Sequence, residues 1–251
     1  MLKTRIIPTL LWKDTTLVKG VGFDSWRRVG TIIPSIKVYN TRQVDELIVL
    51  DITATAQGRE PDYLSIKEFA GECFVPLTFG GGVKSLDSIK KLLRHGADKV
   101  SVNSAIYDNP GIIEKGVKKF GNQCIVASID VIKEGDEYIC FSHSGSINTQ
   151  KKLVDIVQMV YDLGVGEILI TSIEQDGTME GYDIDLIRLV SERVNIPVIA
   201  SGGAGNYNHM YQALLDGKAD AVAAASIFHF TEQTPLEAKK YLQGRGIAVR
   251  N

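Results

Sequence analysis

The stretch VPLTFGGG at residues 75–82 recurs 121 positions later as IPVIASGG at residues 196–203. Each copy is a short apolar run, typical of a buried strand, and glycines end it. A neighbouring segment repeats at the same distance, because VDEL at residues 44–47 recurs as VGEI at residues 165–168. Repetition at a fixed distance indicates an architecture built from similar units. The chain is therefore predicted to contain two similar halves.

Eight apolar runs alternate with helical patterns along the chain. The runs are rich in β-branched residues and almost uninterrupted, as expected of parallel strands that are covered on both faces. They lie at residues 5–11, 46–52, 75–79, 99–102, 123–129, 167–171, 197–200 and 221–225. Segments with helical spacing lie at residues 85–95, 110–120, 152–163, 184–194 and 207–215, and Asp183 and Asn206 are predicted N-caps.

The length of 251 residues fits one (β/α)8 barrel, a fold that typically has about 250 residues. Two half-barrels, about residues 1–122 and 123–251, would each supply four strands, and no linker rich in proline, glycine or serine separates them. We therefore predict an α/β protein with a single (β/α)8 TIM-barrel domain over residues 1–251. The one departure from strict alternation is at residues 133–143, where Glu134-Gly135-Asp136 predicts a β-hairpin.

The composition excludes several classes of partner. The chain has 28 lysine and arginine residues against 30 aspartate and glutamate residues, and their mixed distribution predicts no nucleic-acid binding. No apolar run reaches the roughly 18 residues of a membrane span, and residues 1–8 show no signal-peptide core, so we expect no membrane contact and a cytoplasmic protein. The three cysteines, Cys73, Cys124 and Cys140, have no metal-ligand spacing, so neither a metal site nor a cofactor is predicted.

Two glycine loops at strand ends predict phosphate binding. Active sites of such barrels lie at the C-terminal ends of the strands, where glycine frees backbone N–H groups to bind an anion. A glycine after a strand is more often only a turn, but the internal repeat places the same loop in both halves. The sequence therefore predicts a ligand with a phosphate at each end, bound by Gly81, Gly82, Asn103, Ser104, Gly202, Gly203, Ala225 and Ser226.

Three aspartates near strand ends are candidates for acid–base chemistry. Asp51 ends the second predicted strand, where it can instead cap the following turn, and Asp176 lies in the loop after the sixth strand. Asp130 ends the fifth strand, which begins the second half. Aligning the first strand with the fifth places Leu11 opposite Asp130, so a barrel expected to offer two carboxylates offers one at this position.

Four charged residues begin strands at the opposite end of the predicted barrel: Arg5, Glu46, Lys99 and Glu167. Their side chains are predicted to point into the lower opening, where buried charges are costly unless they are paired. One interpretation is a structural ring of salt bridges that plugs the barrel. The other is a gate over a pore that runs along the barrel axis.

Motifs along essentially the whole chain resemble those of a known family. They are Arg5-Ile6-Ile7-Pro8, Lys13-Asp14, Lys19-Gly20, Asp45-Glu46-Leu47, Leu50-Asp51-Ile52-Thr53-Ala54, Gly80-Gly81-Gly82, Gly96-Ala97-Asp98-Lys99-Val100, Asp176-Gly177-Thr178, Ala200-Ser201-Gly202-Gly203-Ala204-Gly205 and Phe228-His229-Phe230. The family is HisF, the cyclase subunit of imidazole glycerol phosphate synthase.

The resemblance implies a class I glutaminase partner that docks on the N-terminal face of the barrel, at Asp98, and releases ammonia through the charged gate. It also implies that the ammonia travels through the barrel to a phosphorylated small molecule. In this comparison Asp130 matches the general acid and Lys19 a substrate-binding lysine. The further substrate-binding residues implied are Asp51, Thr171 and Asp176, and Gly177 is implied to join the phosphate sites.

The family's catalytic base is missing from this chain. The family has aspartate followed by valine at the end of the first strand, where this chain has Leu11 and Trp12. Residues 21–28 also differ from the family's flexible loop over the substrate. A retained gate without the base is similar to the HisF-like branch of surface-polysaccharide pathways. There the barrel is thought to supply ammonia to a sugar amidotransferase that builds an acetamidino group on a nucleotide-activated sugar.

Three functions remain as alternatives. The first is a non-cyclising, ammonia-conducting subunit of a glutamine amidotransferase system. The second is a working cyclase/lyase of histidine biosynthesis in which Asp130 or Asp51 covers for the missing base. The third is a phosphosugar isomerase of the related two-carboxylate type, which would also require an acid at position 11. Leu11 therefore favours the first function over the other two.

Overall fold

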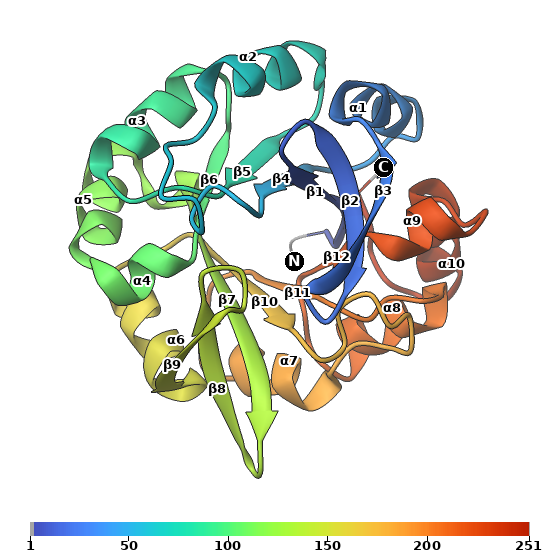
Figure 1. Cartoon of the computed structure of the whole chain (residues 1–251). Coiled ribbons are helices and arrows are strands. Elements are labelled where there is room, and N and C mark those ends of the chain that lie inside the picture. Colours follow the sequence, from blue (N-terminus) through green and yellow to red (C-terminus); the bar gives the residue numbers. More distant parts are fainter. Residues whose placement is uncertain (1–2, 251) are drawn as a thin grey trace.

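Parallel strands form a closed barrel in the computed structural model, which describes residues 3–250 (Figure 1). Its eight strands are β1 (Arg5–Lys13), β4 (Leu47–Asp51), β5 (Leu77–Gly80), β6 (Lys99–Val102), β7 (Ile125–Glu134), β10 (Glu167–Ser172), β11 (Val198–Ser201) and β12 (Ala221–Ala224). The barrel closes because β1 pairs with both β12 and β4, while β10 pairs with both β7 and β11. This confirms the predicted (β/α)8 fold. The predicted domain limits include Met1, Leu2 and Asn251, which lie outside the described residues.

Helices surround the barrel and cover the outer face of its strands (Figure 1). They are α1 (Ile32–Thr41), α2 (Tyr63–Glu72), α3 (Leu86–Arg94), α5 (Gly111–Phe120), α6 (Leu153–Asp162), α7 (Ile184–Ser191), α8 (Tyr207–Leu215) and α10 (Pro235–Gly244). Two short helices, α4 (Ser104–Asp108) and α9 (Ser226–Phe230), follow β6 and β12, and a 3-10 turn, η1 (Asn122–Cys124), precedes β7. The predicted N-caps are confirmed, since Asp183 and Asn206 accept hydrogen bonds from Leu186 N and His209 N. Within residues 3–250, no helix is long and apolar enough to cross a membrane.

Strand alternation divides the apolar residues into two cores. Side chains that point outward from the barrel pack against the helices and form the larger core. Trp12 belongs to this outer core, where its ring meets Phe69 and Phe79 edge-on at centroid distances of 5.2 and 6.4 Å. The smaller core fills the barrel interior and consists of Ile7, Ile48, Val126, Leu169, Ile199, Ala221 and Ala223. This inner core separates the lower end of the barrel from the upper end.

Two hairpins extend from the upper end. The predicted hairpin after the fifth barrel strand is confirmed, because β7 pairs with β8 (Glu137–Ser142) through the turn at Gly135. It is joined by β9 (Ile147–Lys152), which the sequence did not predict. A second hairpin, β2 (Thr16–Val21) with β3 (Asp24–Gly30), lies across the barrel opening in Figure 1. It was also not predicted, because β3 is polar and largely exposed and so lacks the apolar pattern of a buried strand.

Candidate functional site

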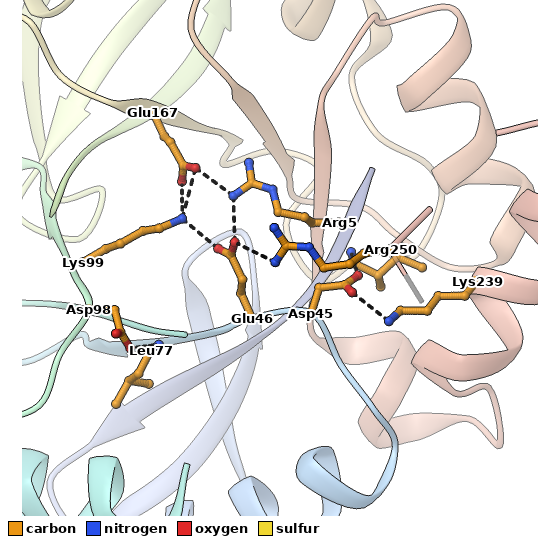
Figure 2. A network of polar contacts seen from close by, with 10 residues as sticks. Arg5, Asp45, Glu46, Leu77, Asp98, Lys99, Glu167, Lys239 and Arg250 are labelled. Atoms are coloured by element: carbon orange, nitrogen blue, oxygen red, sulfur yellow. Dashed lines mark hydrogen bonds and ion pairs between the residues drawn. The ribbon is translucent and has the colours of Figure 1, made fainter. Parts of the chain in front are cut away.

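The four charged residues at the lower end form one closed network of ion pairs (Figure 2). Arg5 Nη1 lies 3.0 Å from Glu46 Oε1 and 2.7 Å from Glu167 Oε1. Lys99 Nζ lies 2.9 Å from Glu46 Oε2 and 3.0 Å from Glu167 Oε2. Each cation therefore bridges the two carboxylates. We call Arg5, Glu46, Lys99 and Glu167 the charged ring.

Pairing within the charged ring favours the ionised forms of Arg5 and Glu46 despite their burial. Burial by itself raises the pKa of Glu46, but the nearby charges of Arg5 and Lys99 outweigh this and hold the pKa below its ordinary value. Burial likewise lowers the pKa of Arg5, and the carboxylates of Glu167 and Glu46 more than reverse the effect. The two glutamates are repeat mates, 121 positions apart, whereas the two cations have no charged repeat mate among the strand starts. The ring thus departs from the two-fold symmetry of the barrel.

A further cation, which sequence analysis missed, lies beside the charged ring. Arg250 Nη1 is 3.8 Å from Glu46 Oε1, and its side chain is half-exposed (Figure 2). Its position depends on the meeting of the two chain ends, where Arg250 N donates to Thr4 O at 3.1 Å and Thr4 pairs with Val249. No local sequence pattern near the C-terminus signals this contact.

Asp98, predicted to lie on the docking face, has an internal contact as well. Its Oδ2 accepts a hydrogen bond from Leu77 N at 2.8 Å, while the residue remains exposed at the lower end. Asp220 makes the matching contact in the second half, where its Oδ2 accepts from Val198 N at 2.9 Å. The aspartate therefore has a structural role in both halves, and docking by Asp98 remains a prediction.

A cavity of about 280 Å³ occupies the upper end of the barrel. It reaches down to Thr9 and Leu169 and is covered in part by Phe23 and Trp26 of the β2–β3 hairpin. Thr9 is buried and its Oγ1 has no hydrogen-bond partner among the described residues. The predicted mouth residues that line the cavity are Leu11, Asp51, Gly81, Gly82, Asn103, Ser104, Asp130, Thr171, Asp176, Gly177, Gly202, Gly203, Ala225 and Ser226.

Asp130 is the carboxyl group best suited to proton transfer in this cavity. Its burial, with a smaller contribution from Asp176, raises its pKa to about 7, although hydrogen bonds from Thr171 and Asn103 act in the opposite direction. Asn103 Nδ2 donates to Asp130 Oδ2 at 2.6 Å. A carboxyl group with a pKa near the working pH can both give and take a proton. The geometry is consistent with the general-acid role that the family resemblance implies.

Lys19 and Asp176 form a buried, oppositely charged pair beneath the β2–β3 hairpin. Burial lowers the pKa of Lys19 and raises that of Asp176, and each partner's charge opposes the shift of the other. Lys19 Nζ donates to Thr9 O at 2.7 Å, so the ammonium lies under the cavity wall rather than in the cavity. Direct contact between Lys19 and a substrate therefore remains a prediction.

Leu11 occupies the position that corresponds to Asp130 in the other half of the barrel. Leu11 is the register partner of Leu50, and Asp130 is the register partner of Thr171. Leu50 and Thr171 are repeat mates, 121 positions apart, so the two pairs are equivalent. The first-half pair is apolar, whereas the second-half pair is polar. The cavity thus has one wall without a proton acceptor at the position where the family carries its base.

Asp51 is held within the loop that follows β4. Its Oδ1 accepts hydrogen bonds from Thr53 N, Ala54 N and Arg59 Nη2, and Arg59 Nη1 lies 2.8 Å from Oδ2. These contacts match the alternative of a turn-capping carboxylate. Contact between Asp51 and a substrate remains a prediction, although the residue lines the cavity.

The two glycine loops have the repeated geometry that the sequence predicts. Gly81 and Gly82 have φ of +107° and +70°, and Gly202 and Gly203 have φ of +91° and +106°. These are backbone conformations that residues other than glycine rarely adopt. Asn103 and Ala225 also match in backbone conformation, at φ −119°, ψ −81° and φ −129°, ψ −72° respectively. Phosphate binding at these loops remains a prediction.

The loops differ in what already contacts them. In the first half, Gly82 N donates to Thr55 Oγ1 at 3.2 Å, and Ser104 Oγ accepts from His143 N at 3.1 Å. Ser144 Oγ donates to Ile52 O at 2.8 Å, so the turn after β8 reaches across the first glycine loop. Sequence analysis missed this turn. His143 and Ser144 adopt positive φ values there, and their polar side chains give no apolar pattern from which the turn could be predicted.

Within residues 3–250, no group of three or more His, Cys, Asp or Glu side chains could hold a metal ion.

Comparisons with known proteins agree with the fold. The family model described as "Histidine biosynthesis protein" matches residues 5–234. The chain is 48% identical over 250 residues to the imidazole glycerol phosphate synthase subunit HisF of Chlorobium limicola, with 100% of both chains covered. The same-named subunits of Chlorobium phaeovibrioides and Chlorobaculum parvum are each 46% identical over 250 residues, again with 100% of both chains covered.

Proposed function

The chain belongs to the histidine biosynthesis protein family, and we propose that it is the ammonia-accepting barrel subunit of a glutamine amidotransferase. The observation that carries this proposal is the charged ring, which closes the lower end of the barrel directly below an apolar interior. A buried ion-pair network is weak support for stability, because apolar side chains could replace it at little cost. Three buried charges and the partly buried Lys99 at this opening therefore require a functional explanation, and gating provides one.

The interior of the barrel suits the passage of a small neutral molecule. Above the charged ring the inner core includes two small residues, Ala221 and Ala223, and it ends at the cavity wall near Leu169. The Thr9 hydroxyl at this level has no hydrogen-bond partner in the described part of the chain, so it is available to hydrogen-bond ammonia as the ammonia leaves the apolar layer. The glutaminase partner would dock on the lower face, where it would exclude water from the charged ring.

The upper cavity supports a conduit without efficient cyclisation. Leu11 cannot accept a proton, and the equivalent Asp130 supplies only one of the two acid–base groups that a proton-transfer site of this symmetry is expected to need. We propose that ammonia leaves the barrel for an acceptor on a separate sugar amidotransferase, which would form an acetamidino group on a sugar of a surface polysaccharide.

The second candidate function is the cyclase subunit of imidazole glycerol phosphate synthase in histidine biosynthesis. The names of the full-length relatives favour it. So does the set Lys19, Asp130 and Asp176, which occupies the upper end with shifted pKa values. In this case Asp130 or Asp51 would have to act without the carboxylate expected at position 11.

One experiment separates the two candidates. The purified chain is given ammonium and the ribulosyl intermediate of histidine biosynthesis, and formation of imidazole glycerol phosphate is followed beside the Chlorobium limicola HisF. We expect a rate lower by roughly 10²- to 10⁴-fold, the usual cost of losing a general base. A rate within about tenfold of the relative would instead establish the cyclase function.

The gate itself is tested with a co-expressed class I glutaminase. Glutamine hydrolysis and transfer of the released nitrogen are measured together in wild type and in Lys99→Ala. We expect glutamine hydrolysis to continue in Lys99→Ala while nitrogen transfer falls, because the charged ring no longer controls the lower opening of the barrel. If no complex forms, or if Lys99→Ala leaves transfer unchanged, the charged ring is a structural plug and the conduit proposal is wrong.

A further inference from the structure

A second buried ion pair lies next to the charged ring (Figure 2). Lys239 of α10 has its Nζ 2.7 Å from Asp45 Oδ1, and the two side chains are 8% and 2% exposed. Lys239 Nζ also donates to Gln43 O at 2.8 Å. The other carboxylate oxygen, Asp45 Oδ2, accepts a hydrogen bond from Ile6 N at 2.8 Å. We call Asp45 and Lys239 the brace, because they connect α10 to the starts of β1 and β4.

The brace holds the chain neighbours of two members of the charged ring. Asp45 directly precedes Glu46, and Ile6 directly follows Arg5. Arg5 Nη1 and Glu46 Oε1 are 3.0 Å apart, so the Asp45 carboxylate connects two backbone segments whose adjacent side chains meet in the ring. A shift of either segment would change this contact, because a salt bridge requires its nitrogen and oxygen to lie within about 4 Å.

Other strand starts are anchored by an aspartate without a lysine. Asp98 and Asp220 each accept a backbone hydrogen bond in the same way as Asp45. Their donors are Leu77 N, at 2.8 Å, and Val198 N, at 2.9 Å. Of these three aspartates, only Asp45 has an ion-pair partner within residues 3–250. Anchoring a strand start therefore does not by itself explain the lysine.

The second half of the barrel has no equivalent of the brace. The repeat mate of Asp45 is Gly166, 121 positions later, and it directly precedes Glu167 of the ring. Gly166 N donates to Ile125 O at 3.0 Å, and a Cβ atom built on Gly166 would lie 2.3 Å from Asn122 O. No side chain fits there, so the packed backbone positions Glu167. A side chain that holds the neighbour of a ring glutamate is thus a feature of the first half alone.

The C-terminal segment contacts the same side of the ring a second time. Arg250 Nη1 lies 3.8 Å from Glu46 Oε1, and Thr4 N, beside Arg5, donates to Ala248 O at 2.8 Å. The end of the chain therefore lies along the Arg5–Glu46 side of the ring (Figure 2). A buried ion pair such as the brace is weak support for stability. Fixing the geometry of the ring is the role that its position offers.

We infer that Lys239 is a positioning residue of the charged ring: by holding Asp45, it fixes the distance between Arg5 and Glu46. The inference deepens the proposed gate and rests on it for its functional consequence. Without the ammonium group, the Asp45 carboxylate would be left buried with the hydrogen bond from Ile6 N, and it would move toward another cation or toward water. The starts of β1 and β4 would then shift, and the ring would no longer close the lower opening.

The crystal structure of Lys239→Met tests the positioning role directly. Methionine is similar in length to lysine but lacks its charge and its hydrogen-bond donors. We expect the separation of Arg5 Nη1 and Glu46 Oε1 to lengthen from 3.0 Å to beyond about 4 Å. Lys240→Met, at the next and exposed position of α10, is the matched control and should leave this separation unchanged.

A second measurement connects the brace to the gate. In the complex with a class I glutaminase, imidazole glycerol phosphate formation from the ribulosyl intermediate is followed with glutamine and, separately, with ammonium. The ratio of the two rates isolates passage through the barrel, because both reactions share the chemistry at the upper end. We expect this ratio to fall in Lys239→Met, as in Lys99→Ala, while glutamine hydrolysis continues.

The two measurements separate failure of the inference from failure of the gate. The inference is overturned if Arg5 and Glu46 stay within about 4 Å in Lys239→Met, since the lysine would then stabilise the fold without positioning the ring. It is also overturned if the ratio falls in Lys99→Ala but not in Lys239→Met. If the separation lengthens and neither variant lowers the ratio, the positioning role stands and the gate proposal is wrong. Should Lys239→Met fail to fold, the double variant with Asp45→Asn removes the unpaired charge, keeps an acceptor for Ile6 N and repeats both measurements.

Discussion

The two ends of the barrel handle buried charge in opposite ways. At the lower end every member of the charged ring contacts at least two oppositely charged partners, and the charges of Arg5 and Lys99 hold the pKa of Glu46 below its ordinary value. At the upper end Asp130 has a pKa raised to about 7, and Thr9 Oγ1 and Asn103 Oδ1 have no hydrogen-bond partner within residues 3–250. The lower network is satisfied by ion pairs within the chain, whereas the upper cavity is lined by polar groups that lack such pairing. The contrast supports the proposed gating role at the lower end and the proposed binding role at the upper end.

The largest expected effect comes from breaking the lower network. Arg5→Ala leaves Glu46 and Glu167 buried with fewer partners, so the free energy of unfolding should fall by about 3–5 kcal/mol. Denaturant unfolding measures this change. Lys37→Ala, which removes an exposed pair with Glu72 at 3.3 Å, is the control and should cost less than about 1 kcal/mol. Equal losses in the two variants would show that the charged ring is not a cooperative buried network.

The next effect concerns the asymmetry of the upper end. Leu11→Asp places a carboxylate opposite Asp130 and should raise the rate of imidazole glycerol phosphate formation by about 10²-fold over wild type. The rate is measured with ammonium as nitrogen source, so that no partner is required. Leu11→Asn, similar in size but unable to accept a proton, should give no gain. A gain of the same size with asparagine would mean that polarity, rather than proton transfer, limits the reaction.

The barrel itself could be predicted from sequence because its strands and helices leave strong local patterns. Uninterrupted apolar runs identified the barrel strands, and the register confirms that Leu11 is equivalent to Asp130. The β2–β3 hairpin escaped prediction because residues of β3 are largely exposed and polar. Its stability comes from docking, for example the hydrogen bond from Gly22 N to Asp176 O at 2.8 Å, which no local pattern encodes.

The repeat predicted the backbone geometry of the upper end well where the halves agree and poorly where they differ. It placed both glycine loops correctly, since each needs positive φ values that only a few residue types tolerate. It could not predict Arg250, whose contact with Glu46 requires residues from both ends of the chain.

The raised pKa of Asp130 predicts a pH-dependent stability. In the folded protein this carboxyl group keeps its proton up to about pH 7, whereas in the unfolded chain it loses it near pH 3.9. The folded state therefore binds more protons between these values, and wild-type stability falls as the pH rises through this window. Asp130→Asn should remove a slope on the order of 1 kcal/mol per pH unit.

The measurement for Asp130 is denaturant unfolding at several pH values between 5 and 8. Asp130→Asn should gain stability relative to wild type as the pH rises, and the difference should level off above about pH 7. Asp136→Asn, in the exposed turn of the β7–β8 hairpin, is the control and should follow the wild-type profile. A constant difference between Asp130→Asn and wild type over this range would show that Asp130 is already ionised at pH 5.

The smallest expected effect separates docking from folding at the lower end. Asp98 and Asp220 each accept one backbone hydrogen bond at the start of a neighbouring strand, from Leu77 N and Val198 N. Replacing either by alanine should therefore reduce the free energy of unfolding by a similar amount, about 1 kcal/mol.

The family resemblance assigns docking only to Asp98, so Asp98→Ala should also weaken the complex with a class I glutaminase, while Asp220→Ala should leave it unchanged. Complex formation is measured by calorimetry at a temperature where both variants are folded. If the two variants weakened the complex equally, the lost affinity would reflect protein stability alone. The lower face would then lack the specific contact at Asp98 that the gate proposal uses to position the glutaminase.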